Sequence, residues 1–421
     1  MARTGLTGGD GSRPGALGTA RASSSLQGRR AAVLLFSYYP SDARPRRAAE
    51  ALAGEGMHVE LICLRKSPME RARETLKGVE ILRLPLKRHR GGPVAYVLQY
   101  SVFILSTFVL LAMRSLTRRY ALVHVHNMPD LLVFSALVPK ILGAKVILDL
   151  HDPMPELMMT IFRLGPASLA VRLLERLERW SIAFADAVFT VNLACKKIFG
   201  GRSCSPDKIQ VVMNSPDEDF FVLRAPESGA MDRTRPFVMM YHGSILERNG
   251  LDVAVDALAR IRQSVPRAEL RIYGDSTQFL EVVLETVRRA GLQDAVRYFG
   301  AKRPQDIVAA IDECDVGIIP NRRSIFTEIN TPTRIFEYLS RGKPVITGRA
   351  PGVLDYFAED ALFFFELGDA EDLARAMAHV FSHSAEVAHV VKRGQEVYLA
   401  HRWRDERRSL VTRAAELLEA V

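Results

Sequence analysis

The stretch Ile325–Thr347, IFTEINTPTRIFEYLSRGKPVIT, decides how the rest of the sequence is interpreted. Thr331 precedes a proline, and a hydroxyl followed by proline is typical of the first turn of a helix. Apolar residues then recur at helical spacing up to Gly342, where we expect the helix to end. The β-branched residues that follow predict a short strand ending near Thr347.

The predicted helix carries Arg334 in its first turn and Glu337 one turn later. A helix N-terminus binds phosphate through its open N–H groups, and arginine adds a positive charge suited to diphosphate oxygens. A buried Glu337 would accept hydrogen bonds from sugar or ribose hydroxyls. The alternative is an ordinary helix–strand unit in which Glu337 faces solvent.

This run resembles the C-terminal motif of the family 4 retaining glycosyltransferases, which have the GT-B fold. The matching residues are Pro332, Arg334, Glu337, Gly342, Pro344 and Val345. In that family the motif holds a nucleotide-sugar donor, which implies a catalytic role for Glu337. The donor contacts that the resemblance implies here are Thr331, Thr333, Arg334 and Ile335. Many members carry another glutamate eight positions before the one that Glu337 matches, and this chain has Ile329 there.

At 421 residues the chain is long enough for two domains. Residues 1–119 contain 20 Lys and Arg against 8 Asp and Glu, a net +12 that exceeds the +9 of the whole chain. The first part should therefore attract phosphate-bearing ligands or an anionic membrane. Since no nucleic-acid-binding motif accompanies this charge, we do not expect a nucleic acid as partner.

The four cysteines lack metal-ligand spacing and predict free thiols in a reducing compartment. We expect no metal site and no cofactor, with the nucleoside diphosphate sugar acting as co-substrate.

Strand and helix patterns predict two α/β domains. Residues 1–29 are rich in Gly, Ser, Ala and Arg and are expected to be disordered. Apolar strands alternating with helices predict a Rossmann-like domain over 30–226. No GxGxxG follows the first strand, which removes most support for a dehydrogenase.

A polar run at 227–235 is the expected linker to a second Rossmann-like domain at 236–402. Residues 403–421 resemble the family's C-terminal helix, which often crosses back to the first domain. We therefore expect the GT-B fold, with two doubly wound domains facing across a cleft. The first would bind the acceptor and the second the donor.

A histidine ends one predicted strand of the first domain, KVILDL at 145–150. His151 sits where α/β crevices bind ligands, and Asp152 beside it could orient the ring. The alternative is a structural histidine bonded to a neighbouring carbonyl. In the family an equivalent histidine lies at the donor sugar, which implies that His151 is catalytic. The acceptor contacts we expect are Tyr39, His126 and Asn127.

The second domain opens with a strand and the segment HGSILERNGL at 242–251, which resembles a family glycine loop. Family members commonly place basic residues where this chain has Ser244 and Asn249. Arg248 is expected to supply the catalytic positive charge instead, the alternative being a solvated loop residue. The further donor contacts that the resemblance implies are Gly243, Ser244, Gly274, Gly300 and Lys302.

Residues 92–113 contain no charge and are long enough for a membrane span. Basic residues flank them, namely Lys87, Arg88 and Arg90 before and Arg114, Arg118 and Arg119 after. Strands on both sides are expected in one sheet, which argues against a span. Three interpretations stay open: a core helix, a helix in the membrane interface and a spanning helix.

Together these patterns predict a retaining glycosyltransferase that moves a sugar from a nucleoside diphosphate sugar to a glycan or lipid-linked acceptor, as in polysaccharide biosynthesis. We expect a cytoplasmic protein, peripheral at the inner face of the membrane. One alternative is a non-catalytic sugar-nucleotide-binding protein, which Ile329, Ser244 and Asn249 favour. A GT-B sugar-nucleotide epimerase is the other, and it would need acidic residues facing the sugar ring.

Overall fold

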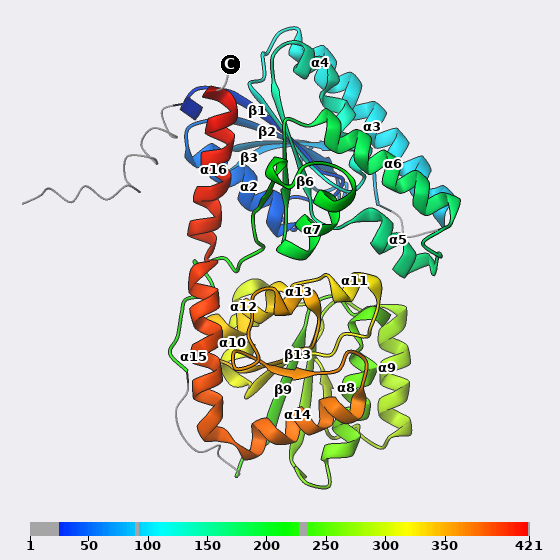
Figure 1. The fold of residues 1–421 in the computed structure, drawn as a ribbon, viewed down its shortest axis with the longest axis vertical. Helices are drawn as coiled ribbons and strands as arrows, with labels where there is room; N and C mark the ends of the chain where they lie inside the picture. Colours follow the sequence, from blue (N-terminus) through cyan, green and yellow to red (C-terminus); the bar gives the residue numbers. More distant parts are fainter. Residues whose placement is uncertain (1–24, 89–91, 227–233, 420–421) are drawn as a thin grey trace, which may run out of the picture.

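The structure is a computed structural model that describes residues 25–88, 92–226 and 234–419. Figure 1 shows two α/β domains stacked along the long axis, with the chain crossing between them on one side. Each domain has one sheet of mainly parallel strands with helices on both faces. The prediction of two Rossmann-like, doubly wound domains is confirmed.

The first domain has an eight-stranded sheet in the order β3-β4-β2-β1-β5-β6-β7-β8. Its strands are β1 (Arg30–Leu34), β2 (His58–Leu64), β3 (Arg73–Leu76), β4 (Val79–Leu84), β5 (Leu122–His126), β6 (Lys145–Leu150), β7 (Ala187–Thr190) and β8 (Ile209–Val211). Neighbouring strands pair in parallel except β3, which runs antiparallel to β4 at the edge. The order reverses between β1 and β5, and such switch points bind ligands in open α/β sheets.

Helices cover both faces of this sheet. They are α2 (Ala43–Gly54), α3 (Pro93–Ser115), the 3-10 helix η1 (Asp130–Ala136), α4 (Leu137–Ile141), α5 (Met154–Phe162), α6 (Leu169–Phe184), α7 (Leu193–Arg202) and the 3-10 helix η2 (Pro206–Lys208). Ala31 and Val33 of β1 pack with α2, whereas Ala32 and Leu34 pack with α3 and η1. Burial on both faces explains why this strand is a continuous apolar run.

The second domain has six parallel strands in the order β11-β10-β9-β12-β13-β14. The strands are β9 (Phe237–His242), β10 (Ala268–Tyr273), β11 (Val296–Tyr298), β12 (Val316–Ile319), β13 (Val345–Gly348) and β14 (Phe363–Phe365). The helices are η3 (Glu247–Asn249), α8 (Leu251–Ile261), α9 (Gln278–Arg289), α10 (Pro304–Glu313), α11 (Ile325–Glu328), α12 (Thr333–Ser340), α13 (Pro351–Leu354), α14 (Ala370–Ser382) and α15 (Ser384–Ala400). The strand order reverses between β9 and β12.

The stretch that decides the fold forms α11, α12 and β13. Gly342 ends α12 with a left-handed φ of 73°, and a Cβ there would lie 2.4 Å from the carbonyl oxygen of Ala225. Thr331 does not cap this helix, contrary to the prediction from its position. Its hydroxyl donates to the carbonyl of Gly352 at 2.6 Å, and Pro332 takes the N-cap position.

Residues 25–29 do not share the disorder predicted for the tail. Leu26 is fully buried in the core beside α2, and the N–H of Gly28 donates to the carbonyl of Gly56 at 2.9 Å. Outside the described residues lie 1–24 of the predicted tail and 227–233 of the predicted linker.

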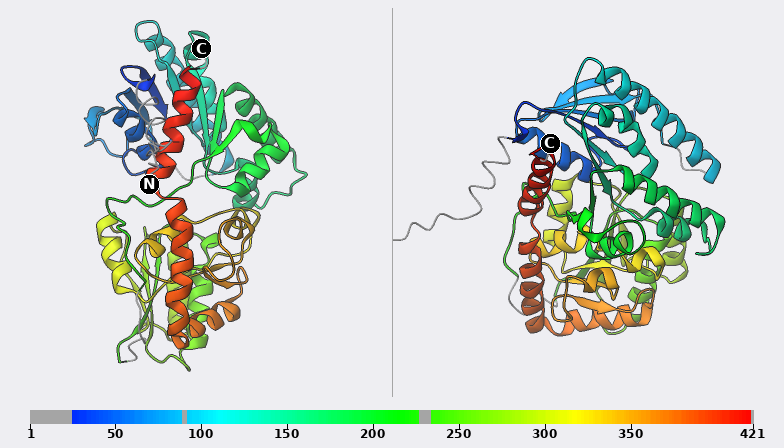
Figure 2. Two further views of the ribbon diagram at one scale, coloured as in Figure 1. Left: turned by 60° about the vertical axis from the view of Figure 1, so that its left-hand side comes forward. Right: turned by 45° about the horizontal axis from the view of Figure 1, so that its top comes forward.

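The last helix, α16 (Trp403–Glu419), packs against α2 of the first domain. Both views in Figure 2 show α15 and α16 aligned along one side of the two domains. This second crossing touches the first one. The hydroxyl of Ser215 donates to the carbonyl of His401, and Gln395 Nε2 donates to the carbonyl of Arg224 at 2.6 Å.

The uncharged segment at 92–113 forms α3, which lies on the outside of the first domain (Figure 1). Phe103, Thr107 and Leu111 are fully buried against the domain. Only 17% of its most apolar window is buried, so the core interpretation is wrong. Among the described residues, Val94–Ser115 is the one helix that length and composition would allow to cross a membrane.

Candidate active site

A cleft between the two domains joins the carboxyl ends of their central strands. Its cavity has a volume of about 660 Å³, within the range of small-molecule sites. The first domain contributes residues that follow β1, β6 and β8, and the second contributes the loop after β9 and the start of α12. The predicted residues that line the cleft are His151, Gly243, Ser244, Arg248, Lys302, Thr331, Thr333, Arg334 and Glu337.

Arg334 is held in place on the second-domain wall. Its Nη1 donates to the carbonyl of His242 at 2.7 Å, and its guanidinium lies over the ring of Tyr241, 4.8 Å from the centroid. Gly243 lies against this guanidinium, since a Cβ there would be in ordinary contact with Nη1 at 3.4 Å. A guanidinium that is already ordered loses little entropy on binding, which suits it to a diphosphate.

Glu337 lies one turn further along α12 and faces the cleft with 19% of its side chain exposed. The solvent-facing alternative is therefore wrong. Burial raises the pKa of Glu337 to about 7, while Arg334 and Arg47 act in the opposite direction. Its Oε2 lies 3.3 Å from Nε2 of His242, whose own pKa is lowered to about 3 by burial and by Arg334. At neutral pH His242 is therefore uncharged, whereas Glu337 lies close to the midpoint of its titration.

The glycine loop follows β9 at the edge of the cleft. Gly243 has a φ of 120°, which side-chain-bearing residues rarely adopt. Asn249 Nδ2 donates to the carbonyl of Ser244 at 2.6 Å and closes the loop. Arg248 lines the cleft with its guanidinium 5.5 Å from the centroid of the Phe326 ring. It is therefore packed against the protein rather than simply solvated.

Three residues predicted to contact the donor do not line the cleft. The Ile335 side chain is fully buried in the core, and its N–H donates to the carbonyl of Pro332 at 3.0 Å. The predicted donor contact of Ile335 is wrong, because its N–H is bonded within the helix and its side chain is packed in the core. Gly274 supports the glycine loop from behind, since a Cβ there would lie 2.2 Å from the carbonyl oxygen of Gly243. Gly300 in turn accepts a hydrogen bond from the N–H of Gly274 at 3.1 Å.

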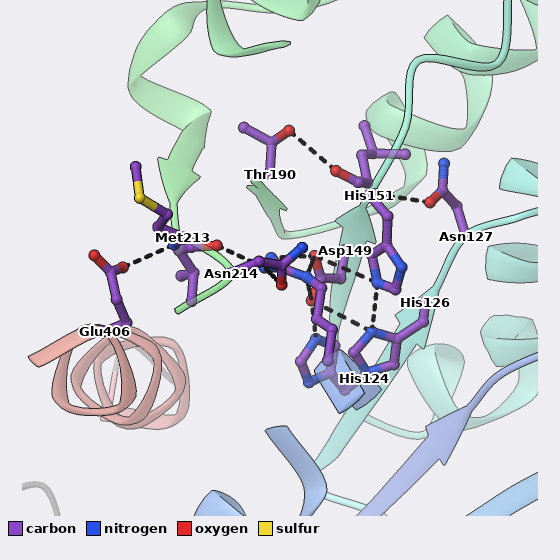
Figure 3. A network of polar contacts seen from close by, with 12 residues as sticks. His124, His126, Asn127, Asp149, His151, Thr190, Met213, Asn214 and Glu406 are labelled. Atoms are coloured by element: carbon purple, nitrogen blue, oxygen red, sulfur yellow. Dashed lines mark hydrogen bonds and ion pairs between the residues drawn. The ribbon is translucent and has the colours of Figure 1, made fainter. Parts of the chain in front are cut away.

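His151 lies on the opposite wall, at the carboxyl end of β6 (Figure 3). Nε2 of the His151 ring lies 2.9 Å from Nδ1 of His126, and the backbone N–H of His151 donates to Oδ1 of Asn127 at 2.8 Å. Asn127 also donates to the carbonyl of Asp152 at 2.9 Å, which ties the ends of β5 and β6 together. The ring is 18% exposed and pairs with another ring, so the alternative of a bond to a neighbouring carbonyl is wrong.

Asp149 supplies a negative charge beside these histidines (Figure 3). Arg44 pairs with it at 2.6 Å, and both side chains are buried. Although burial opposes the effect, Arg44 and the neighbouring imidazoles hold the pKa of Asp149 well below its usual range. Burial lowers the pKa of His126 to about 4 and that of His151 well below its usual range. His126 and His151 are therefore neutral near pH 7.

His124, His126 and Asp149 also have the composition of a metal site, with ligand atoms within 4.8 Å of one another. The guanidinium of Arg44 already donates to both carboxylate oxygens of Asp149, at 2.6–3.1 Å. A dication would have to displace this buried arginine. The residues fit an ion-pair network better than a metal centre.

A smaller cavity of about 140 Å³ lies on the first-domain side of His151. It is lined by His126 and Asn127, which the sequence predicts as acceptor residues, and also by Asp42 and Asp152. Burial raises the pKa of Asp42, and it raises that of Asp152 to about 6. A carboxyl group accepts hydrogen bonds when ionised and can also donate one when protonated.

Tyr39 belongs to neither cavity. Its side chain is buried in the core beside α2, and its hydroxyl lies 3.4 Å from Oε1 of Glu50. The prediction that this side chain contacts the acceptor is wrong, because the ring packs inward from the loop after β1.

Two arginines of the first-domain wall, Arg44 and Arg47, line the cleft but were not predicted as site residues from the sequence. Arg47 donates to the carbonyl of Ser215, and its guanidinium lies 5.1 Å from the centroid of the Trp403 ring. Burial lowers the pKa of Arg47 to about 10, which leaves it charged at neutral pH. The available signal was their spacing, because two arginines on the alanine-rich face of α2 indicate buried partners.

Two sequence families match most of this chain. Residues 42–215 match the Glycosyl transferase 4-like domain, and residues 236–383 match the Glycosyl transferases group 1. The amylovoran biosynthesis glycosyltransferase AmsK of Erwinia amylovora is 25% identical over 193 residues, covering 45% of this chain and 46% of AmsK. The chain spans about half the length of the curated relatives it matches.

Solved structures share the fold. Sucrose-phosphate synthase from Thermosynechococcus elongatus superimposes with a TM-score of 0.75 at 17% identity, covering 93% of this chain and 100% of that one. Anabaena HepE in complex with UDP-glucose gives a TM-score of 0.66 at 14% identity, with coverages of 93% and 100%. At these identities the likeness concerns the fold alone.

Proposed function

Since the chain belongs to the family 4 glycosyltransferases and has their GT-B fold, we propose that it transfers a sugar from a nucleoside diphosphate sugar to a carbohydrate acceptor with retention of anomeric configuration. The observation that carries this proposal is the lining of one cleft. Arg334 and Glu337 of the family motif face it from the second domain, and His151 faces it from the first.

The diphosphate would bind around the N-terminus of α12. Arg334, Arg248 and Lys302 line this part of the cleft, and Arg47 adds a charge from the first domain. As the bond to the sugar breaks, negative charge develops on the departing diphosphate. Ordered guanidinium groups and the helix N-terminus stabilise that charge without further reorganisation. The Anabaena complex with UDP-glucose supports uridine diphosphate sugars as the first donors to test.

The sugar ring would lie between Glu337 and His151. Glu337 and its neighbour His242 can accept and donate hydrogen bonds to hydroxyl groups of the donor sugar. His151, neutral at pH 7, can do the same from the opposite wall without adding a charge near the reacting carbon. Transfer passes through an oxocarbenium-like state, and closure of the cleft would exclude the water that competes as acceptor.

The acceptor would approach from the first domain through the smaller cavity. Asp42, Asp152 and Asn127 offer side-chain oxygen acceptors there, which suits the hydroxyl groups of a glycan. A relative named for amylovoran biosynthesis supports polysaccharide assembly as the setting. A glycan, free or linked to a lipid, is the proposed acceptor.

A ligand-induced thermal shift tests the donor site directly. A donor at 100 times its dissociation constant should stabilise the wild type by about 2.7 kcal/mol. One class among UDP-, GDP- and ADP-sugars should give this shift, and Arg334→Ala and Glu337→Ala should abolish it. Arg375→Ala and Glu371→Ala on α14 are matched controls, because both side chains are exposed. If no donor shifts the folded wild type, the proposal is wrong.

The alternative of a non-catalytic binding protein rests on Ile329, Ser244 and Asn249, which stand where the family commonly has charged residues. Donor hydrolysis in the absence of acceptor separates the two. An enzyme should release the nucleoside diphosphate slowly, and the His151→Ala variant should release less. Donor binding without any release would favour the binding protein.

A further inference from the structure

The outer surface of α3 is apolar along its whole length. Eight large apolar residues along and just after the helix are exposed, namely Val94, Val97, Leu98, Val102, Leu105, Val109, Met113 and Leu116, and we call them the α3 surface. Val94 and Leu116, at its two ends, are 81% and 80% exposed. Helix α4, which packs on α3, adds Ile141 at 75% exposure. Contiguous apolar patches of this kind mark contact with a partner or a membrane.

The polar side chains of α3 do not make this surface hydrophilic. Ser106 donates to the carbonyl of Val102 at 2.7 Å, and Gln99 donates to the carbonyl of Ala95 at 3.0 Å. Each of these bonds runs to the residue four positions earlier, so Ser106 and Gln99 form hydrogen bonds within their own helix. A helix in contact with hydrocarbon needs this satisfaction, whereas a helix in water does not.

Basic residues flank both ends of the α3 surface. Lys87 and Arg88 are exposed before the helix, and Arg118 and Arg119 are exposed after it. The helix of 23 residues therefore has positive charge at both ends and no charged residue between Val94 and Met113. A spanning segment usually carries its excess of basic residues on one side of the membrane.

We propose that the α3 surface docks on an anionic bilayer, with the helix lying flat in the interface. Its apolar side chains would enter the acyl boundary, and the basic residues at both ends would contact headgroups of the same leaflet. A span is disfavoured because Phe103 and Leu111 pack into the domain and β4 and β5 belong to one sheet. A second copy of α3 is a poor partner, since basic ends would meet in either orientation.

The docked helix would bring the acceptor side of the protein to the lipid surface. Tyr100 of α3 and Arg88 just before it line the smaller cavity beside His151. The ring of Tyr100 also packs on Phe36 at the end of β1, with centroids 5.0 Å apart. An acceptor anchored in the bilayer could therefore reach the cavity without leaving the surface. This consequence rests on the proposed function, whereas the docking itself does not.

Co-sedimentation with vesicles tests the docking without any activity assay. The full chain should sediment with vesicles of phosphatidylcholine and phosphatidylglycerol, and far less with phosphatidylcholine alone or at high salt. Leu98→Glu/Leu105→Glu should weaken binding by about tenfold or more, because charge then enters the apolar boundary. Arg118→Ala/Arg119→Ala should weaken it by about fivefold per arginine.

The matched control is Val282→Glu/Leu399→Glu, which places charge on exposed apolar residues of the second domain. It should bind vesicles as the wild type does. The proposal is overturned if the wild type stays in the supernatant with both vesicles, or if the control loses as much binding as the α3 variant. A wild-type dimer that Leu98→Glu/Leu105→Glu dissociates, without vesicle binding, would assign the surface to a second copy. Resistance of the membrane-bound protein to alkaline extraction would instead show a span.

Discussion

The ion pair of Arg44 and Asp149 supports the His151 wall from inside the first domain. Asp149→Asn should lower the free energy of unfolding by about 3–5 kcal/mol, because it leaves a buried arginine without its counter-charge. Urea denaturation measures this loss. The control is Asp294→Asn, whose partner Arg262 lies at the surface, and it should change stability little. Equal effects of the two substitutions would contradict the central role of the buried pair.

Glu337 gives the cleft a group that titrates near neutral pH. Burial raises its pKa from an ordinary value of 4.5 to about 7. The folded state thus favours the protonated form, and the stability it contributes is present below pH 4.5 and lost as the pH rises through about 7. Glu337→Gln stays neutral, so the variant should gain about 2–4 kcal/mol of stability relative to wild type across this window.

Chemical denaturation at a series of pH values measures that gain. The exposed residue Glu371, changed to Gln, is the control for an ordinary carboxyl group. A difference between Glu337→Gln and wild type that does not vary with pH would show that the carboxyl is not buried in solution.

Some of the residues that form and support the cleft can be predicted from the sequence, and others cannot. Arg334, Glu337 and His151 were predictable because each lies at a helix start or strand end, where local pattern and family motif agree. Arg44 and Asp149 are 105 positions apart in the chain, and their pairing exists only after the sheet has formed. Ile335 and Tyr39 were misassigned for the same reason, since the core takes up both side chains.

At the level of elements, Gly274 sets the position of the glycine loop. Gly274→Ala would place a Cβ 2.2 Å from the carbonyl oxygen of Gly243, so the loop must move. We expect a loss of stability of about 1–3 kcal/mol and weaker donor binding, although the residue does not line the cleft. Gly165→Ala is the control, because nothing lies within 4 Å of a Cβ there. Calorimetric donor titration of both variants decides the matter, and unchanged affinity in Gly274→Ala would contradict the prediction.

Most strands were predictable because strands buried on both faces have a simple sequence pattern. The bounds of β6, Lys145–Leu150, match the strand predicted at 145–150. Strand β3 was missed, since it lies at the edge with mostly exposed residues and has no apolar run. The hydroxyl of Thr331 was expected at a helix cap and instead bonds to Gly352, a contact that local sequence cannot reveal.

At the scale of the whole molecule, a few contacts across the cleft hold the two domains together. The N–H of Leu193 donates to the hydroxyl of Tyr356 at 2.8 Å. Tyr356→Phe should favour an open arrangement and raise the KM for the donor by about fivefold, the equivalent of one net hydrogen bond. Tyr120→Phe removes a bond inside the first domain and should leave this KM unchanged. Steady-state kinetics compares them, and an unaltered KM in Tyr356→Phe would separate that contact from closure.

The two-domain arrangement followed from ordered motifs at strand ends, but the place of α3 did not. A helix that is apolar on all sides fits a core, an interface or a bilayer equally well, because no periodic pattern marks its inner face. The neighbouring elements decide, and among the side chains of α3 that the structure describes, Phe103, Thr107 and Leu111 alone have no exposed surface.

The paired crossings between the domains have a mechanical consequence. Ser215 bonds to His401, Arg224 to Gln395 and Glu218 to Arg404, so the two connections are fastened to each other along one side of the molecule. These links would act as a hinge. The domains could rotate about it to open and close the cleft, whereas sliding or twisting past one another would break the links. The opposite margin, where α5 meets α11, travels farthest in such a swing. Substrates would enter and products leave there, through a modest rotation that breaks few contacts near the hinge.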